Sequence, residues 1–308
     1  MGEAKRRKLA GQYEATAEPT AVVAAFDEHP SWPLSNREVQ GRLEGKFTAL
    51  GVDPYKPGFH DSQPFLAAER RDRHIMDDYA RLVEARTYSE QELLEAQRKI
   101  IAASKAVADA AAADGRKGLC VVASGILSRM LDEMGVWNYS AKATLTVTFP
   151  RSVSGEPRYF YVLDEGELVA AHAVVVAPPF AVIDPTVKFQ PWERASMAKV
   201  LPVLVMQRDF VPYQWRDEDL ASPEVRAELR FRGTSLDAFL RQRHPDMFAT
   251  LTALPGRTAQ YPGGELRYVV TAVGGYQEPL RELHGNASLA GLTPAQLFDK
   301  RVTPMLES

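Results

Sequence analysis

Two segments in the first half of the chain carry apolar residues at the spacing of an amphipathic helix. The first begins at Ser89, which has the spacing of a capping box with Glu92, and good helix formers continue to about Ala113. The second begins near Leu119 and ends at Gly135, a residue type that often stops a helix. The spacing therefore predicts two consecutive helices, of which the second has an apolar stripe that faces a core.

The period of the pattern then changes from that of a helix to that of a strand. Polar and apolar residues alternate from Lys142 to Phe149, which is typical of a half-buried strand, and Arg158 to Leu163 predicts a second strand. Leu168 to Val176 and Phe180 to Ile183 are apolar on both faces, as in strands that are covered on both sides. The order of two helices and four antiparallel strands predicts an α+β fold, with the second helix packed on an antiparallel sheet.

The remaining segments are expected to be additions to this core, which spans residues 88–192. Residues 1–20 are polar and charged and predict a flexible basic tail. Residues 21–87 predict a mostly helical and loop extension, and residues 193–308 an α+β extension packed on the core. The elements expected in these extensions are helices at Asn36–Leu50, Glu193–Val200, Ser222–Arg230, Ser235–Arg243 and Pro294–Lys300, and a strand at Glu265–Val273.

Charge and composition exclude several classes of function. The chain has 37 Lys and Arg against 40 Asp and Glu, so it lacks the basic field that drives general nucleic-acid binding. No glycine-rich phosphate loop is present, which argues against a nucleotide cofactor. No apolar stretch has the length of a signal peptide or a membrane helix. We therefore expect a cytoplasmic protein that does not enter a membrane.

The single cysteine, Cys120, excludes an intrachain disulfide and any metal site built from several thiolates. It lies in the first turn of the second predicted helix, where unpaired N–H groups and the helix dipole favour a negative charge. Arg116 and Lys117 lie just before it and also favour the thiolate. This position suits a nucleophile, although a cysteine there can also be only structural.

A histidine and an aspartate interrupt the apolar strands that follow. His172 lies in the middle of its predicted strand, and Asp184 closes the next one, twelve residues later. If the hairpin loop is the odd-length Ala177-Pro178-Pro179, His172 falls directly opposite Asp184 on the same face, with Cβ atoms about 5 Å apart. The aspartate would then orient one ring nitrogen and leave the other free for a partner. The alternative is a buried pair that only stabilises the sheet.

These residues together resemble the transglutaminase-like branch of the papain-like thiol enzymes. The run from Gly118-Leu119-Cys120 to Gly135-Val136 is similar to the nucleophile helix of that family. Ala171-His172-Ala173 and the later Ile183-Asp184-Pro185-Thr186 are similar to its histidine strand and to the Asp-Pro-Thr that closes the next strand. The resemblance covers about residues 88 to 192. It implies Cys120 as nucleophile, His172 as general base and acid, and Asp184 as the residue that orients the imidazole.

The chain departs from the family in two places. Val174 stands where the family often has an aromatic residue, and Ala112 to Leu119, just before Cys120, contain no Gln or similar donor to complete an oxyanion hole. The N–H of Cys120 is one candidate donor, and the side chains of Trp137, Asn138 and Gln97 are others.

The function expected from this resemblance is that of a thiol enzyme that acts on an amide or peptide bond of a polypeptide or amide substrate, through an acyl-enzyme at Cys120. Protease, amidase or deamidase, and acyltransferase outcomes all begin with this intermediate, so the three residues do not separate them. No cofactor or metal is expected. His60-Asp61 and His74 with Asp77 and Asp78 have metal-capable side chains, but a charged solvated helix face explains them better.

An alternative comes from a different class of protein. The same fold can be catalytically inactive and serve as a protein-binding module, with the segments 1–85 and 193–308 supplying the partner surface. Its signature would be a buried Cys120 beyond hydrogen-bond reach of His172.

Overall fold

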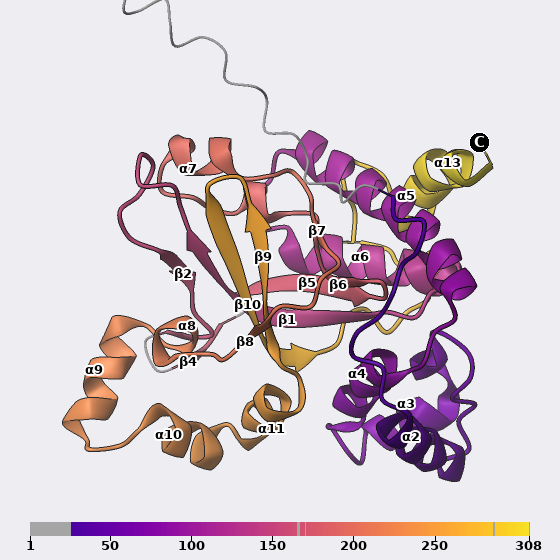
Figure 1. Ribbon diagram of the computed structural model, residues 1–308, viewed down its shortest axis with the longest axis horizontal. Coiled ribbons are helices and arrows are strands. Elements are labelled where there is room, and N and C mark those ends of the chain that lie inside the picture. Colours follow the sequence, from indigo (N-terminus) through magenta and orange to yellow (C-terminus); the bar gives the residue numbers. More distant parts are fainter. Residues whose placement is uncertain (1–25, 165–166, 170, 286, 308) are drawn as a thin grey trace, which may run out of the picture.

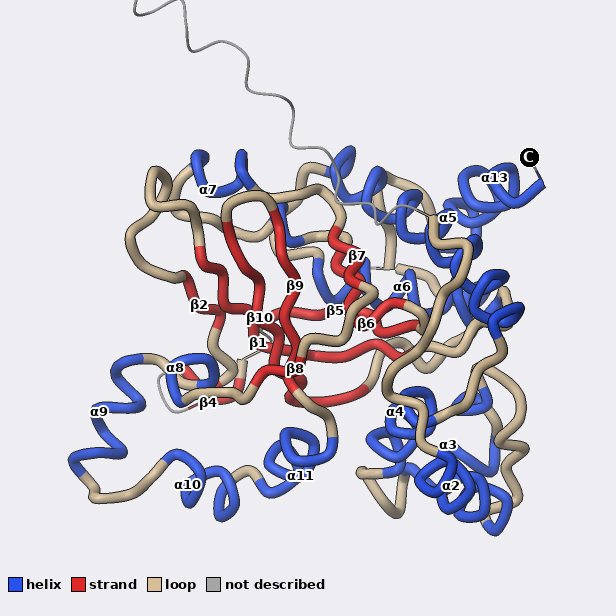
Figure 2. Tube along the Cα trace, in the orientation of Figure 1, coloured by secondary structure: helices blue, strands red, loops and turns tan. Residues whose placement is uncertain are grey.

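The computed structural model describes residues 26–164, 167–169, 171–285 and 287–307, and the expected basic tail, 1–20, lies outside these residues. Helices surround a curled antiparallel sheet (Figure 1), which confirms the predicted α+β class. Figure 2 shows the strands in the middle of the molecule and the helices around them.

The two predicted helices of the core are present at the expected positions. α5 (Glu90–Asp114) begins behind Ser89, whose hydroxyl accepts from the N–H of Glu92 while the Glu92 carboxylate accepts from the N–H of Ser89. Gly115 ends this helix in the left-handed conformation, with φ of 75°, which a glycine adopts at little cost. α6 (Cys120–Glu133) follows and packs on both α5 and the sheet.

The described residues form an eight-stranded antiparallel sheet in the order β7-β6-β5-β1-β10-β9-β8, with β2 also paired to β1. Figure 1 shows β9 and β10 running across the direction of β1, β5 and β6, so the sheet is strongly curled. The strands are β1 (Tyr139–Thr148), β2 (Arg158–Phe160), β5 (His172–Ala177), β6 (Phe180–Asp184), β7 (Val205–Gln207), β8 (Pro212–Tyr213), β9 (Gly256–Tyr261) and β10 (Gly264–Val273).

The strand predicted over Leu168 to Val176 is not continuous. Glu167–Leu168 forms β4, which pairs with β3 (Leu163–Asp164) in a separate two-stranded ribbon, and β5 begins only at His172. The histidine therefore lies at the start of its strand and not in the middle.

The C-terminal part of the chain contributes strands to the core sheet itself. β10 pairs with β1 from Ala141↔Val273 to Thr148↔Glu265, so it lies at the centre of the sheet. The strand expected at Glu265 to Val273 is thus confirmed, but residues 193–308 complete the sheet and are more than an extension packed on it. β7 adds an edge next to β6.

Helices from three parts of the chain cover this sheet. The helices between residues 37 and 85, here called the N-terminal unit, pack apolar side chains against Tyr139 and Tyr268 of the sheet. These side chains include Phe47, Phe59 and Tyr79. α5 and α6 cover β5 and β6 on the other side, together with the C-terminal helices. The N-terminal unit consists of α2 (Arg37–Ala49), η1 (Phe59–Asp61), α3 (Gln63–Glu69) and α4 (Ile75–Ala85), and the C-terminal elements are η3 (Leu280–Glu282), α12 (Pro294–Leu297), the π-helical η4 (Phe298–Val302) and α13 (Thr303–Glu307).

A third apolar cluster joins the β3–β4 ribbon to the helices that precede β9. Leu163, Leu220 and Leu240 contribute to it, and Val269 of β10 connects it to the sheet. The helices after β6 are η2 (Val187–Phe189), α7 (Ala195–Val200), α8 (Asp217–Leu220), α9 (Pro223–Phe231), α10 (Leu236–Arg243) and α11 (Pro245–Ala253). Among the described residues, no helix combines the length and the apolar character needed to cross a bilayer.

Candidate functional site

Cys120 is the first residue of α6, as the sequence predicts. The Ser124 hydroxyl donates to the carbonyl of Ala173 at 3.0 Å, which holds the first turns of the helix against β5. The N–H of Gly118 donates to the carbonyl of Phe189 and fixes the approach to the helix from the β6 side. Cys120 itself is buried, with 4% of its surface exposed. Leu119, the N-cap residue of α6, provides no side-chain cap, so the first N–H groups of the helix have no capping partner among the described residues.

His172 and Asp184 form a buried ion pair at the start of β5 and the end of β6. The Nε2 atom of His172 lies 2.7 Å from Oδ2 of Asp184, and neither side chain is exposed to solvent. The structure thus brings together the two residues that the hairpin argument placed on one face.

The register that produces this contact differs from the predicted one. Ala177 pairs with Phe180, so the hairpin loop has two residues, and a bulge between Val175 and Ala177 follows before Val175 pairs with Ile183. Continuing that pairing by one step places Asp184 beside Val174. His172 and Asp184 are therefore diagonal neighbours rather than directly opposite. A two-residue loop alone would place the two side chains on opposite faces of the sheet, and the extra residue of the bulge brings them back to the same face. The imidazole is long enough to reach its diagonal neighbour.

Asp184 is held by two further residues. Its Oδ1 accepts from the N–H of Thr186 at 2.9 Å and from the Thr186 hydroxyl at 3.2 Å, and its Oδ2 accepts from the Tyr268 hydroxyl at 3.0 Å. The sequence offered the Asp-Pro-Thr run as a signal for Thr186. It offered no signal for Tyr268, because this residue reaches Asp184 from β10, a strand late in the chain. These contacts fix the carboxylate that in turn orients the imidazole.

The two members of the pair stabilise each other's charged forms. Burial by itself would lower the pKa of His172, but the negative charge of Asp184 and its hydrogen bond raise the pKa to about 10, with a smaller contribution from Cys120. Burial would likewise raise the pKa of Asp184, yet His172, Thr186 and Tyr268 hold it below its ordinary value. At neutral pH the imidazole therefore carries a proton.

The other ring nitrogen of His172 faces a different situation. Nδ1 is buried and makes no hydrogen bond of ordinary geometry with any described residue. Cys120 is near enough to be one of the groups that raise the pKa of the imidazole. The arrangement is therefore an imidazole oriented through Nε2, with Nδ1 uncommitted and a thiol in its vicinity.

The structure places Trp137 and Asn138 away from this arrangement, which corrects their assignment as oxyanion donors. Ala143 pairs with His172, whereas Tyr139 pairs with Val176 at the far end of β5, roughly 13 Å along the strand. The Asn138 amide donates both of its hydrogens near the C-terminal end of α6, to Asp132 Oδ1 and to the carbonyl of Val136. The Trp137 ring packs under Arg86 and beside Phe59 of the N-terminal unit.

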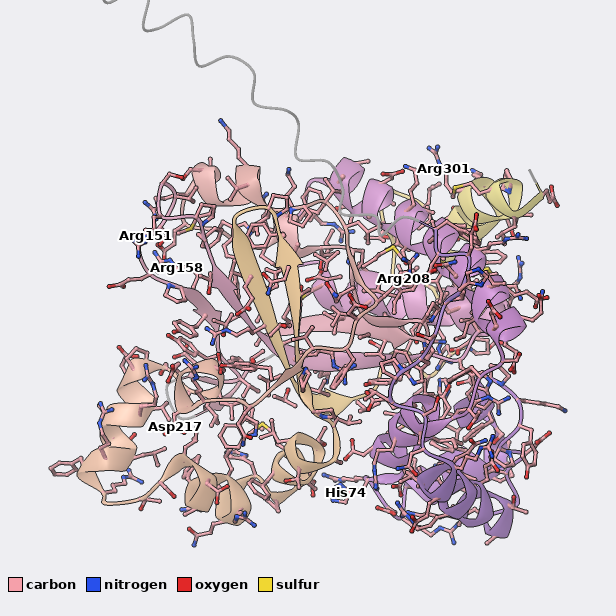
Figure 3. The ribbon with its side chains drawn as sticks, in the orientation of Figure 1. His74, Arg151, Arg158, Arg208, Asp217 and Arg301 are labelled. Carbon is pink, nitrogen blue, oxygen red and sulfur yellow. The ribbon has the colours of Figure 1, made fainter. Side chains whose placement is uncertain are left out.

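Gln97 is likewise distant from Cys120. The Lys99 ammonium donates to the carbonyl of Met134, so this part of α5 adjoins the C-terminal end of α6, about 20 Å from its N-terminus. The Gln97 amide donates to the carbonyl of Asp27, and its oxygen accepts from Arg208, which is labelled in Figure 3. Of the donors that the sequence suggested, only the N–H group of Cys120 itself lies at the start of α6.

His60 and Asp61 do not belong to a solvated helix face, contrary to the sequence interpretation. They surround the buried guanidinium of Arg129, which donates to Asp61 at 2.7 Å and to Asp132 at 3.1 Å. Burial, helped by Arg129, lowers the pKa of His60 to about 3. This cluster ties η1 to α6. Within the described part of the chain, no group of three or more His, Cys, Asp or Glu side chains is arranged to hold a metal ion.

Comparison of the chain with protein-family models, with curated proteins and with solved structures found no match.

Proposed function

We propose that the protein is a thiol enzyme that acts on an amide or peptide bond through an acyl-enzyme at Cys120. The observation that carries the proposal is the buried His172–Asp184 pair, in which Nε2 is bound to the carboxylate while Nδ1 has no partner among the described residues. A cysteine at an uncapped helix N-terminus lies in the vicinity of that free nitrogen. This is the arrangement that a thiolate and an imidazolium need in order to act together.

The proposed reaction uses His172 as a proton carrier. The Cys120 thiolate attacks the carbonyl carbon, and the C–N bond breaks as the imidazolium gives its Nδ1 proton to the leaving amine. A water molecule then gives one proton to the neutral imidazole while its oxygen attacks the thioester carbon. The C–S bond then breaks, the carboxylic acid product leaves, and Cys120 and His172 are again a thiolate and an imidazolium. If an amine takes the place of water, the product is a new amide.

The negative oxygen of each tetrahedral intermediate needs hydrogen-bond donors. The N–H groups of the first turn of α6 supply them in this proposal, because no side chain caps that turn and the helix dipole favours a negative charge there. Asp184 does not exchange a proton. It keeps the imidazole oriented and protonated, and Thr186 and Tyr268 keep the carboxylate in place.

A transglutaminase-like core is part of the proposal. Its support is the order of elements along the chain: a helix that begins with the cysteine, a strand that begins with His172, and a next strand that ends with Asp184. The proposed substrate is a polypeptide or another amide, and hydrolysis and transfer share the acylation step.

A second candidate function is a catalytically inactive fold that binds another protein. The burial of Cys120 and the complete burial of His172 favour it, because an enzyme must admit its substrate to both side chains. The lack of a hydrogen bond of ordinary geometry between Nδ1 of His172 and any described residue, Cys120 included, also fits this alternative.

Alkylation of the single cysteine distinguishes the two. The rate of iodoacetamide modification is measured by mass spectrometry from pH 5 to pH 9 for the wild type, His172→Ala and the control His244→Ala. We expect fast alkylation at pH 6 in the wild type and the control, and slow alkylation in His172→Ala, with folding of each checked by circular dichroism. A wild-type thiol that reacts only above about pH 8, at a rate independent of His172, would reject the enzyme and support the binding module.

A further inference from the structure

A cavity of about 580 Å³ opens beside the start of β5. Its wall includes Ala171, which directly precedes His172, and Lys142, the neighbour of the residue that pairs with His172. The remaining walls come from α4, α11, the end of β10 and the β3–β4 ribbon. Figure 3 shows His74, one of the lining residues, between α4 and α11. This volume is in the range of sites that bind small molecules or short peptide segments.

The acidic side chains of the cavity are already engaged. His74 lies between them, with Nδ1 3.4 Å from Asp77 and Nε2 3.3 Å from Asp246. Asp77 also accepts from the Thr250 hydroxyl at 2.9 Å. Asp77 is thereby engaged within the wall, whereas the side chain of Asp246 keeps 60% of its surface exposed.

The two long cationic side chains of the wall have no such partners. Arg73 and Lys142 are exposed, and neither forms an ion pair with any residue that the structure describes. The cavity thus offers two free positive charges on a chain whose net charge is -3. A ligand with carboxylate groups would complement it.

The ribbon wall contributes apolar surface. Leu168 and Val169 are 51% and 43% exposed, although large apolar side chains are usually buried. Both line the cavity, together with Met247 from α11. An occupant would therefore gain from an apolar side chain as well as from acidic ones.

We infer that this cavity binds an acidic polypeptide segment that carries an apolar side chain. Ala171 of the wall directly precedes His172 in the chain, although His172 itself is fully buried and does not line the cavity. We place the segment in the part of the substrate next to the reacting amide, and this last step rests on the proposed function. Arg73 and Lys142, which lie in the wall without ion-pair partners among the described residues, supply the charges that pair with the acidic segment.

The binding step can be tested without catalysis. Fluorescence anisotropy is measured on Cys120→Ala with a labelled peptide in which glutamates flank a leucine, and with its counterpart in which lysines replace the glutamates. We expect the acidic peptide to bind more tightly, and Lys142→Glu and Arg73→Glu each to weaken it by about tenfold. Lys199→Glu on α7 makes the same change in net charge away from the cavity and should alter the affinity by less than about twofold.

The link to the reactive cysteine has its own measurement. The acidic peptide, at saturating concentration, should slow iodoacetamide alkylation of Cys120 in the wild-type protein by severalfold, and the basic peptide should not. Equal binding of the two peptides, an unchanged affinity in Lys142→Glu, or displacement of the peptide by an oligonucleotide at equal charge would overturn the inferred ligand. Binding without protection would overturn its place beside the cysteine. If the peptide binds as expected while alkylation is independent of His172, only the proposed chemistry fails.

Discussion

Two buried ion pairs lie close together. His172 and Asp184 both belong to the curled sheet, whereas the other pair joins Glu84 of α4 to Arg257 of β9. Arg257 of β9 is the register partner of Tyr268, whose hydroxyl binds Asp184. The Glu84 carboxylate accepts from Arg257 at 2.7 Å and from the Tyr139 hydroxyl at 2.6 Å. In both pairs, charges that would be costly alone are buried beside an opposite charge.

The pairs differ in what their cations can do. Tyr139 and Glu84 raise the pKa of Arg257 even though burial would lower it, so this guanidinium never releases its proton. It donates to Glu84 and to the carbonyl of Ala181, and it ties α4 to two strands. His172 has a nitrogen without a partner among the described residues and belongs to a residue type that can exchange protons. Burial of a charge pair alone therefore does not indicate chemistry, whereas an uncommitted nitrogen near a thiol does.

The largest expected effect concerns the fixed pair. Arg257→Met leaves Glu84 buried without its cation, so the free energy of unfolding should fall by about 3 to 5 kcal/mol, measured by urea denaturation. Arg241→Ala removes an exposed ion pair with Asp237 and should cost less than about 1 kcal/mol. If the free energy of unfolding fell by a similar amount in both variants, the buried pair would contribute no more to stability than an exposed ion pair.

The next largest effect is on the rate of Cys120 alkylation, which should depend on the His172–Asp184 pair but not on the Glu84–Arg257 pair. Asp184→Asn removes the charge that keeps His172 protonated, and burial then lowers the pKa of the imidazole. Alkylation of Cys120 at pH 6 should slow by about 10²-fold. Glu84→Gln should leave this rate unchanged when both variants are compared under conditions where they are folded. An equal loss of rate in the two variants would contradict the distinction.

A smaller effect is expected from the support of Asp184. Tyr268→Phe removes a hydrogen bond to a carboxylate and should lower the free energy of unfolding by about 1.5 to 3 kcal/mol. Tyr261→Phe on the adjacent strand removes a hydrogen bond to the neutral carbonyl of Thr148 and should cost about 1 kcal/mol. If the control lost as much as Tyr268→Phe, the hydroxyl of Tyr268 would have no preference for a charged acceptor.

The smallest effect is a pH dependence in the Arg129 cluster. Burial raises the pKa of Asp132 to about 7, so the folded state binds its proton more tightly than the unfolded chain does. The resulting stability is complete below the unfolded pKa, near 4, and is lost as the pH rises through 7.

From pH 6 to pH 8, wild type should therefore lose stability relative to Asp132→Asn, by an amount on the order of 1 kcal/mol in urea denaturation. Asp114→Asn is the control, because Arg116 lowers the pKa of Asp114 to about 2, below this pH interval. A constant difference between wild type and Asp132→Asn across the interval would show that Asp132 does not titrate there.

Local features of the fold were predictable from the sequence. The capping box at Ser89, the stop at Gly115 and the start of α6 at Cys120 all involve residues a few positions apart. The expectation that His172 and Asp184 share a face also held, although the two-residue loop and the bulge were not foreseen. Such features depend on hydrogen bonds and side-chain periods within one helix or one hairpin.

The surroundings of the candidate site were not predictable in this way. Trp137, Asn138 and Gln97 were plausible donors by residue type, but the direction of α6 and the pairing of β1 with β5 place them at the opposite end. The apolar run from Leu168 was predicted to be part of one strand, but Leu168 belongs to the separate β3–β4 ribbon, which forms a wall of the cavity.

The sequence by itself determined the two helices of the core, the strands β1, β2, β5, β6 and β10, the position of the only cysteine at a helix start and the shared face of His172 and Asp184. It did not predict α4, α11 or the strands β7, β8 and β9. Only the tertiary structure decided that β10 lies beside β1, that Tyr268 thereby reaches Asp184, and that one imidazole nitrogen stays uncommitted. The physical reason is the separation along the chain of the residues that interact. Helix caps and strand alternation arise from neighbours along the chain, whereas strand order and the partners of a buried side chain depend on which distant segments pack together.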